Sequence, residues 1–203
     1  SDTQKGLENF AKTKAGKSFF GQFANKGDKI GSVEFEKTGK YANHNLNFSE
    51  LDDGNIEGGT TNPINRSVYG PMQEGKTNDY IDFYIRADNK MDNISINMPE
   101  TIGHEAFLHL SQYLDDYIKA FEANDLEGAQ SVLDKYKEGN PNGARNHLSQ
   151  YYKTKKAEKY YTFINQLKSV LNPKQVQKQV DNDRVKNLRQ AKSLLNKSQR
   201  KDY

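Results

Sequence analysis

The segment Pro99–Phe121 decides the fold, because the apolar residues change there from strand-like alternation to helical spacing. It reads PETIGHEAFLHLSQYLDDYIKAF. Its apolar side chains recur at steps of three and four residues, at Phe107, Leu110, Leu114, Ile118 and Phe121. This spacing is typical of an amphipathic helix with one buried face, and a Pro and a Glu at the start favour helix initiation. The sequence therefore predicts a helix that begins at Pro99.

The residues after this segment are predicted to be helical to the end of the chain. A second helix is expected over 125–137, and the run EGNPNG at 138–143 is a strong stop signal. A third helix is expected over 145–171, and a fourth, after Pro173, over 174–197.

The residues before the segment mix helices and strands. Two short helices are expected between Thr3 and Lys26, with a break around Ala15 and Gly16. The Gly- and Asn-rich stretch 51–78 is predicted to be a loop. Alternating apolar residues predict four strands, the last two joined as a hairpin by the polar link 88–93; they lie at 33–35, 46–48, 79–87 and 94–98.

The predicted fold class is α+β, with a small mixed or antiparallel sheet in the N-terminal half and a helical C-terminal half. All 203 residues are expected to form one domain. Its parts are helices, strands and loop in 1–98, helices in 99–172 and a basic helical tail in 173–203. Hydrophobic residues make up only 33% of the chain, but 12 Tyr and 10 Phe predict a small, aromatic-rich core.

Composition and charge exclude several classes of protein. Cys is absent, which excludes disulfides and thiolate ligands. There is no apolar run long enough to cross a membrane and no signal-peptide pattern. The net charge is +3, but the tail 173–203 carries nine Lys or Arg against three Asp or Glu. We interpret this tail as a solvated helix. A nucleic-acid contact is less favoured, because no aromatic residue is interleaved before Tyr203.

Two of the four His residues lie five positions apart on the predicted helix, with a Glu directly after the first: His104, Glu105 and His109. Neutral imidazoles bind Zn²⁺, and a carboxylate beside the metal can take a proton from the attacking water. The pattern therefore predicts a zinc site with Glu105 as the general base.

The five-residue step between the two His is unusual for metal ligands on a helix. On an ideal α-helix it separates two side chains by about 140°, whereas a four-residue step separates them by about 40°. A one-residue π-bulge would bring His104 and His109 together, and Gly103 would let the backbone adjust. Two alternatives stay open. Glu105 and His109 could chelate the ion while His104 acts as base, or the residues could belong to a solvated polar face.

A catalytic zinc normally has a third protein ligand. His147, at the start of the predicted third helix, is the candidate, and Glu127 and Asp134 are weaker ones. Tyr151 follows His147 by four residues and could stabilise an oxyanion, with core packing as its alternative role. His44, in a polar stretch, is expected at the surface.

Several stretches resemble the C-terminal toxin domains of Rhs-type polymorphic toxins from Bacteroidota. They are residues 10–16 (FAKTKAG), residues 23–30 (FANKGDKI) and residues 100–109, which contain the His-Glu-x-x-x-His core. The turn at 140–143, with His147 after it, also fits. The resemblance extends over about residues 5–170.

This resemblance implies a metallopeptidase class of toxin, delivered between bacteria and neutralised by a cognate immunity protein. It implies His104, His109 and His147 as zinc ligands and Glu105 as base, on the helices of 99–172 in a zincin-like fold. The chain would then be secreted, or delivered into a target cell as part of a larger toxin, and would act on a protein or peptide. A metal-dependent nuclease toxin and a non-enzymatic binding module with structural His residues are the alternative functions.

Overall fold

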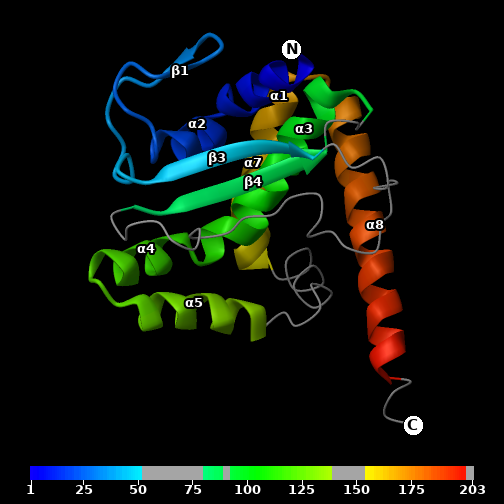
Figure 1. Cartoon of the computed structure of the whole chain (residues 1–203). Coiled ribbons are helices and arrows are strands. Elements are labelled where there is room, and N and C mark those ends of the chain that lie inside the picture. Colours follow the sequence, from blue (N-terminus) through cyan, green and yellow to red (C-terminus); the bar gives the residue numbers. More distant parts are fainter. Residues whose placement is uncertain (52–79, 89–91, 139–153, 200–203) are drawn as a thin grey trace.

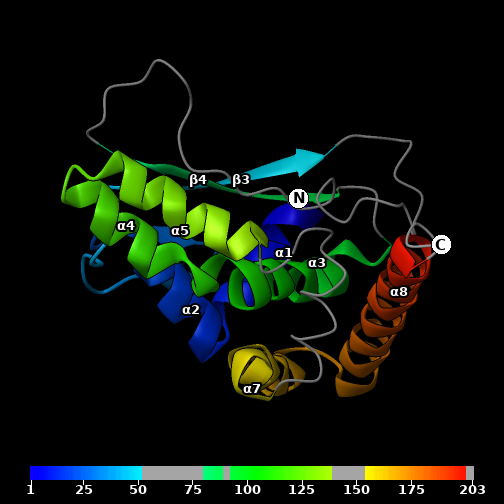
Figure 2. The same cartoon turned by 90° about the horizontal axis from the view of Figure 1, so that it is seen from below.

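A computed structural model describes residues 1–51, 80–88, 92–138 and 154–199. The fold is α+β and mostly helical, as predicted. Figure 1 shows the strands β3 (Asn45–Leu51) and β4 (Asp82–Asp88) side by side, and the long helix α8 (Pro173–Gln199) along one side of the molecule. In the perpendicular view of Figure 2, the strand pair lies on one face of the helices and α7 (Thr154–Val170) on the opposite face.

The two predicted N-terminal helices are confirmed as α1 (Asp2–Ala11) and α2 (Lys14–Gly21). They separate at Thr13, slightly before the predicted break at Ala15 and Gly16. The hydroxyl of Thr13 accepts a hydrogen bond from the Gly16 amide at 2.9 Å, which caps the first turn of α2. A capping side chain, rather than the Gly, therefore sets the boundary.

The predicted strands at 46–48 and 79–87 are confirmed as β3 and β4, but they pair with each other in parallel. Asn45 pairs with Asp82 at one end of the ladder and Leu51 with Asp88 at the other. A parallel pair needs a connection of a dozen residues or more, and the chain between these strands is long enough. The predicted loop lies in this connection, and its residues 52–78 are outside the described part of the chain.

The predicted strand at 33–35 is only the two-residue strand β2 (Val33–Glu34), paired antiparallel with β1 (Lys29–Ile30). Gly31 lies in the turn between them with φ of +59°, a conformation that favours glycine. The described residues thus contain two separate two-stranded sheets, one parallel and one antiparallel, in place of a single mixed or antiparallel sheet.

The prediction of a strand and hairpin at 88–98 is wrong, because Ile94–Gly103 forms the helix α3. Ile94, Met98 and Ile102 lie four residues apart, and this spacing, rather than the alternation at 94–98, describes the helix. Met98 and Ile102 are fully buried, and Met98 packs against Gly6 of α1. A five-residue alternation was too short to separate a strand from a helix.

Pro99 lies inside α3, five residues after the helix begins, and does not start it as predicted. A proline cannot donate the backbone hydrogen bond that would reach the carbonyl of Ser95. The side-chain amide of Asn9 in α1 donates to that carbonyl instead, at 3.0 Å. Asn9 is itself buried. Its contact gives the carbonyl of Ser95 a hydrogen-bond donor in place of the one that Pro99 lacks, and it attaches α1 to α3.

One cluster of buried apolar residues extends from α1 to α8, and its centre is aromatic as predicted. The rings of Phe10, Phe107 and Phe163 meet with centroids 5.2–6.0 Å apart. All five apolar residues of the predicted stripe that begins at Phe107 are buried. The helix that carries them is interrupted, however, and continues only as α4 (Leu114–Glu122).

The later helices agree with the prediction where they are described. The helix expected at 125–137 is α5 (Leu126–Glu138), and the one expected at 174–197 is α8. Residues 154–170 of the predicted third helix form α7, and its residues 145–153 lie outside the described part. The tail is not simply solvated, because Val176 and Val180 of α8 are buried in the core.

Position 103 requires a glycine because of its close contact with α7. Its backbone angles are helical and would allow any residue. A Cβ at this position would overlap the ring of Phe163, a side chain with no exposed surface. Overpacking a core typically costs about 1–3 kcal/mol, more than the roughly 1 kcal/mol that Ala gains over Gly in a helix. We therefore expect Gly103→Ala to lower the free energy of unfolding, measured in urea, by up to about 2 kcal/mol.

Gly21→Ala is the matched control for this substitution. A Cβ at Gly21 would make ordinary contact with the Phe35 ring at 3.5 Å. Gly21 ends α2, so the change should leave stability unaltered or raise it slightly. Equal stability of the two variants would contradict the packing role assigned to Gly103.

Candidate metal centre

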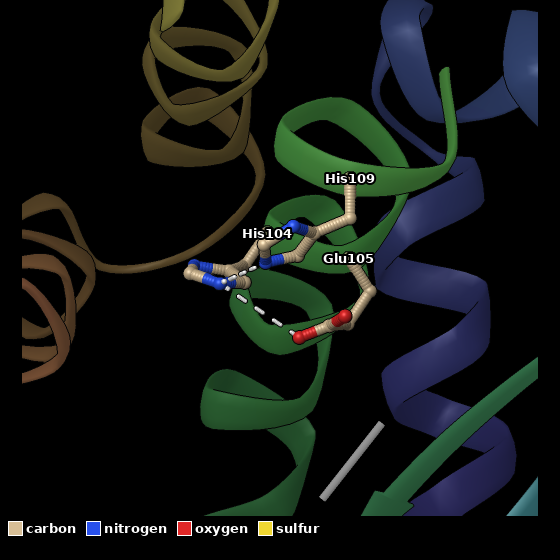
Figure 3. A group of neighbouring side chains, drawn as sticks. All are labelled: His104, Glu105 and His109. Atoms are coloured by element: carbon tan, nitrogen blue, oxygen red, sulfur yellow. Dashed lines mark hydrogen bonds and ion pairs between the residues drawn. The ribbon is translucent and has the colours of Figure 1, made fainter. Parts of the chain in front are cut away.

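The residues His104–His109 form a π-helical turn between α3 and a short 3₁₀ turn, Leu110–Gln112. The predicted π-bulge is therefore present, and its wider turn places the two His side chains on the same side. Figure 3 shows their rings pointing at each other, with the Glu105 carboxylate beside them. The two Nε2 atoms are 3.1 Å apart. In a turn with i→i+5 hydrogen bonds, side chains five positions apart lie on the same side, so the five-residue step allows His104 and His109 to meet.

The three side chains of the motif are buried rather than solvated. His104, Glu105 and His109 are 5%, 6% and 8% exposed. The alternative of a solvated polar face is therefore wrong for these residues. The Glu105 Oε1 atom is 3.7 Å from Nε2 of His104, and the three side chains each offer a ligand atom within 4.8 Å of the others. This buried His/Glu/His group could hold a metal ion.

The spacing of the two imidazole nitrogens fits one ion between them. Zinc binds imidazole nitrogen at about 2.05 Å, so two nitrogens in a tetrahedral site lie about 3.3 Å apart. The observed separation of 3.1 Å is close to this value. Little side-chain movement would be needed to form two bonds to the same ion.

Helix α8 contributes a carboxylate behind His104. Oδ2 of Asp183 is 3.2 Å from the Nδ1 atom of His104. An ionised carboxylate only accepts hydrogen bonds, so Nδ1 carries a proton and donates to Asp183. In the neutral imidazole the lone pair is then on Nε2, the atom that faces His109. This is the arrangement of a His ligand with an outer carboxylate partner.

Helix α5 contributes a hydroxyl behind His109. The Tyr136 hydroxyl is 2.8 Å from Nδ1 of His109. A tyrosine hydroxyl both donates and accepts, so this contact is compatible with either neutral tautomer of the imidazole. The two imidazoles are therefore contacted from different helices and by groups of different chemistry.

Negative charge surrounds His104 and favours a cation. Burial by itself lowers the pKa of His104, but the charge and hydrogen bond of Asp183 and the charge of Glu105 outweigh it and raise the pKa above its usual value. The same field that stabilises a proton on the imidazole also stabilises a metal cation at Nε2. A bound cation and a proton would compete for that lone pair.

A second buried carboxyl group lies behind Asp183. Burial, and then the charge and hydrogen bond of Asp183, raise the pKa of Glu100 well above its usual range. In its protonated form Glu100 donates to Asp183. Its Oε1 atom accepts a 2.7 Å hydrogen bond from the hydroxyl of Tyr160, which is completely buried. Glu100, His104 and Asp183 also lie close enough together to be considered as metal ligands.

The other predicted site residues are placed less favourably or lie outside the described chain. His147 and Tyr151 are in 139–153, which is not described. Glu127 and Asp134 are exposed on α5, the helix whose Tyr136 does reach the centre.

A tyrosine that the sequence did not single out, Tyr113, is buried. Burial, then the neighbouring Tyr136 and Glu105, raise its pKa well above the usual value.

The prediction that His44 lies at the surface is wrong. Its side chain is completely buried and its Nδ1 atom accepts a 3.0 Å hydrogen bond from the Ile81 amide. Its Nε2 atom is 2.8 Å from a carboxylate oxygen of Glu122. These contacts attach the start of the strand pair to α4. They give His44 a structural role apart from the metal centre.

Sequence reasoning missed Asp183 and Tyr136, although a signal for each was present. Asp183 stands on the stripe formed by Val176, Val180 and Asn187 of α8, where an acidic residue interrupts a buried face. Tyr136 continues the buried stripe of α5 by one further step of three residues after Leu133. A polar group at a core position of a helix needs a partner, and that partner is the metal centre.

Comparison of the chain with known protein families, characterised proteins and solved structures found no match. Among the described residues, no helix is long and apolar enough to cross a membrane.

Proposed function

We propose that the chain is a zinc-dependent hydrolase, with His104 and His109 as metal ligands and Glu105 as general base. The facing Nε2 atoms of the two His, 3.1 Å apart and supported from behind, carry this proposal. Two facing imidazoles suit zinc, because imidazole is a preferred zinc ligand, and a carboxylate beside them suits a general base. His147 remains the predicted third ligand.

The substrate and biological setting that we propose come from the sequence resemblance. They are a metallopeptidase-like toxin domain of the Rhs type, a protein or peptide substrate and a cognate immunity protein. The domain would reach its target cell by secretion or by delivery within a larger toxin. The metal-bearing helix beside a small sheet supports a zincin-like arrangement, with a π-turn where most such sites have a regular helix.

The proposed reaction is hydrolysis of an amide bond. Zinc, when bound, supplies Lewis acidity and makes water a stronger acid. Glu105 is buried next to the ligands, 3.7 Å from Nε2 of His104, where its carboxylate can accept the proton of the attacking water. Glu105 then passes that proton to the leaving amine. The low exposure of the site excludes bulk water and strengthens these charge interactions.

The burial of the whole cluster favours a second function, a structural metal site in a binding module. Structural zinc sites are closed and have four protein ligands, whereas catalytic sites keep one position open. His104, Glu105 and His109 are each less than 10% exposed, as a closed site would be. In that case Glu105 would be a ligand and not a base.

Metal content per chain, measured on protein purified without chelator or His-tag, tests the proposal. We expect about one zinc in the parent protein, because the ligand spacing fits a single ion. The His104→Ala/His109→Ala double variant should contain none. Parent protein that takes up no metal, even when zinc is offered, would refute both the hydrolase and the structural-site function.

A further inference from the structure

The geometry points to Asp183 and Tyr136 as positioning residues that give the two ligand histidines different tautomeric freedom. We propose that Asp183 of α8 locks His104 with its Nε2 lone pair toward the metal, whereas Tyr136 of α5 allows His109 to change tautomer when the metal binds. This inference rests on the proposed function, since it concerns how the same centre is held before and after metal loading.

Asp183 can lock His104 because it accepts hydrogen bonds and cannot donate one while ionised. Its Oδ2 atom is 3.2 Å from Nδ1 of His104, a distance that brings the Nδ1–H group into contact. The opposite tautomer, with the proton on Nε2, would place the Nδ1 lone pair against the carboxylate. Electrostatic repulsion in a buried site makes that arrangement costly.

The carboxylate of Asp183 is itself held by a buried carboxyl group. Glu100 forms a hydrogen bond with it from α3. Glu100 in turn accepts from the Tyr160 hydroxyl at 2.7 Å and from the Gln179 amide at 3.5 Å. A chain of polar groups from α3, α7 and α8 therefore fixes the position of Asp183, and through it the His104 ring.

Tyr136 is different because its hydroxyl can serve either tautomer of His109. Without metal, the Tyr136 hydroxyl donates to Nδ1 of His109, and Nε2–H of His109 donates to the lone pair of His104 at 3.1 Å. With metal, the proton of His109 is on Nδ1, the Tyr136 hydroxyl accepts it, and both Nε2 lone pairs face the ion. When both imidazoles are neutral, the number of protons on each side chain is the same in the two states.

The consequence is a metal centre that keeps its shape when empty. Two lone pairs facing each other at 3.1 Å would repel, but the His109 Nε2–H group turns this contact into a hydrogen bond. The consequence extends to the basic C-terminal helix, because Asp183 belongs to α8. Docking of α8 against α3 and α7 is then part of metal binding.

Zinc affinity, measured by competition with a chromophoric chelator, tests the role of Asp183. Loss of an outer partner of a His ligand typically weakens metal binding by about 10–100-fold, and we expect this loss in Asp183→Asn. Asp181→Asn is the matched control: it makes the same change on the same helix, at a residue that contacts Gln177 and Arg184. Its affinity should stay within about twofold of the parent.

Imidazole ¹⁵N shifts in the full chain test the tautomers directly, in a way that a loss of stability would not imitate. In the metal-free parent we expect His104 with its proton on Nδ1 and His109 with its proton on Nε2. Adding zinc should move the ring proton only in His109, from Nε2 to Nδ1, whereas the Nε2 shifts of both imidazoles should change because both bind the ion. In Asp183→Asn, whose side-chain amide can also donate, His104 should become a mixture of the two tautomers.

The possible outcomes separate this inference from the proposed function. Equal zinc affinity of Asp183→Asn and Asp181→Asn would overturn the inference alone. Two zinc ions per parent chain, one of them lost in Asp183→Asn, would also overturn it, because Asp183 would then be a ligand in its own right. A parent that binds no zinc would refute the proposed function. A metal-free His104 with its proton on Nε2 would still overturn the inference in that case.

Discussion

Glu105→Gln is expected to reduce amide hydrolysis by about 10²–10⁴-fold, the usual contribution of a general base. Glutamine has nearly the same shape but cannot accept the proton of the attacking water. The two imidazole ligands and their outer partners are unchanged, so zinc content should stay at the parent level. Cleavage of a proteome-derived peptide library, read by mass spectrometry, measures the loss, and killing of target cells measures its biological effect.

Glu158→Gln provides the control for this prediction. Glu158 is exposed on α7, so the same chemical change is made away from the motif. Its activity should match that of the parent. Retained activity in Glu105→Gln would exclude Glu105 as the base. Loss of zinc from that variant would instead identify Glu105 as a ligand and favour the structural metal site.

The His/Glu/His group could be predicted in part because its signal is local. His104, Glu105 and His109 are close in sequence, their residue types are chemically specific, and the five-residue step requires a π-turn if the two His are to meet. The structure contains that turn and brings the three side chains together. The spacing of residues along one helix was therefore enough to predict that these side chains meet, because the need for the two His to approach each other indicated a π-turn in place of a regular helix.

The outer partners could not be predicted in the same way, because they come from distant helices. Asp183 lies 79 positions after His104, and its hydrogen bond depends on how α8 packs against α3. The charge of the tail suggested a solvated helix, and that average concealed one partly buried acidic residue, Asp183. Charge counted over a segment says nothing about which face of a helix carries it.

The error at 94–98 has a similar physical origin. Ile94, Ile96 and Met98 alternate, but they are also followed by Ile102 at helical spacing, and tertiary contacts decide between the two patterns. Asn9 of α1 satisfies the carbonyl that Pro99 leaves without a partner, so a helix can run through the proline. No local pattern contains the contribution of Asn9.

Zinc is expected to raise the midpoint of thermal unfolding by roughly 8–16 °C. A ligand present at about 1,000 times its dissociation constant stabilises the folded state by about 4 kcal/mol. For a chain of this size, each kcal/mol shifts the midpoint by about 2–4 °C. Scanning calorimetry of the parent with zinc, and after exhaustive chelation, measures the difference.

The His104→Ala/His109→Ala variant should show no difference between zinc and chelator, because its ligands are gone. An unchanged midpoint in the parent would contradict specific metal binding.

The folding state of the metal-free parent separates the two proposed functions. The aromatic core of Phe10, Phe107 and Phe163 makes no use of the metal, and the empty centre is held by its own hydrogen bonds. We therefore expect the metal-free chain to remain folded at 25 °C and to unfold cooperatively. A closed structural site would instead supply folding energy, and its removal would unfold the chain without heating.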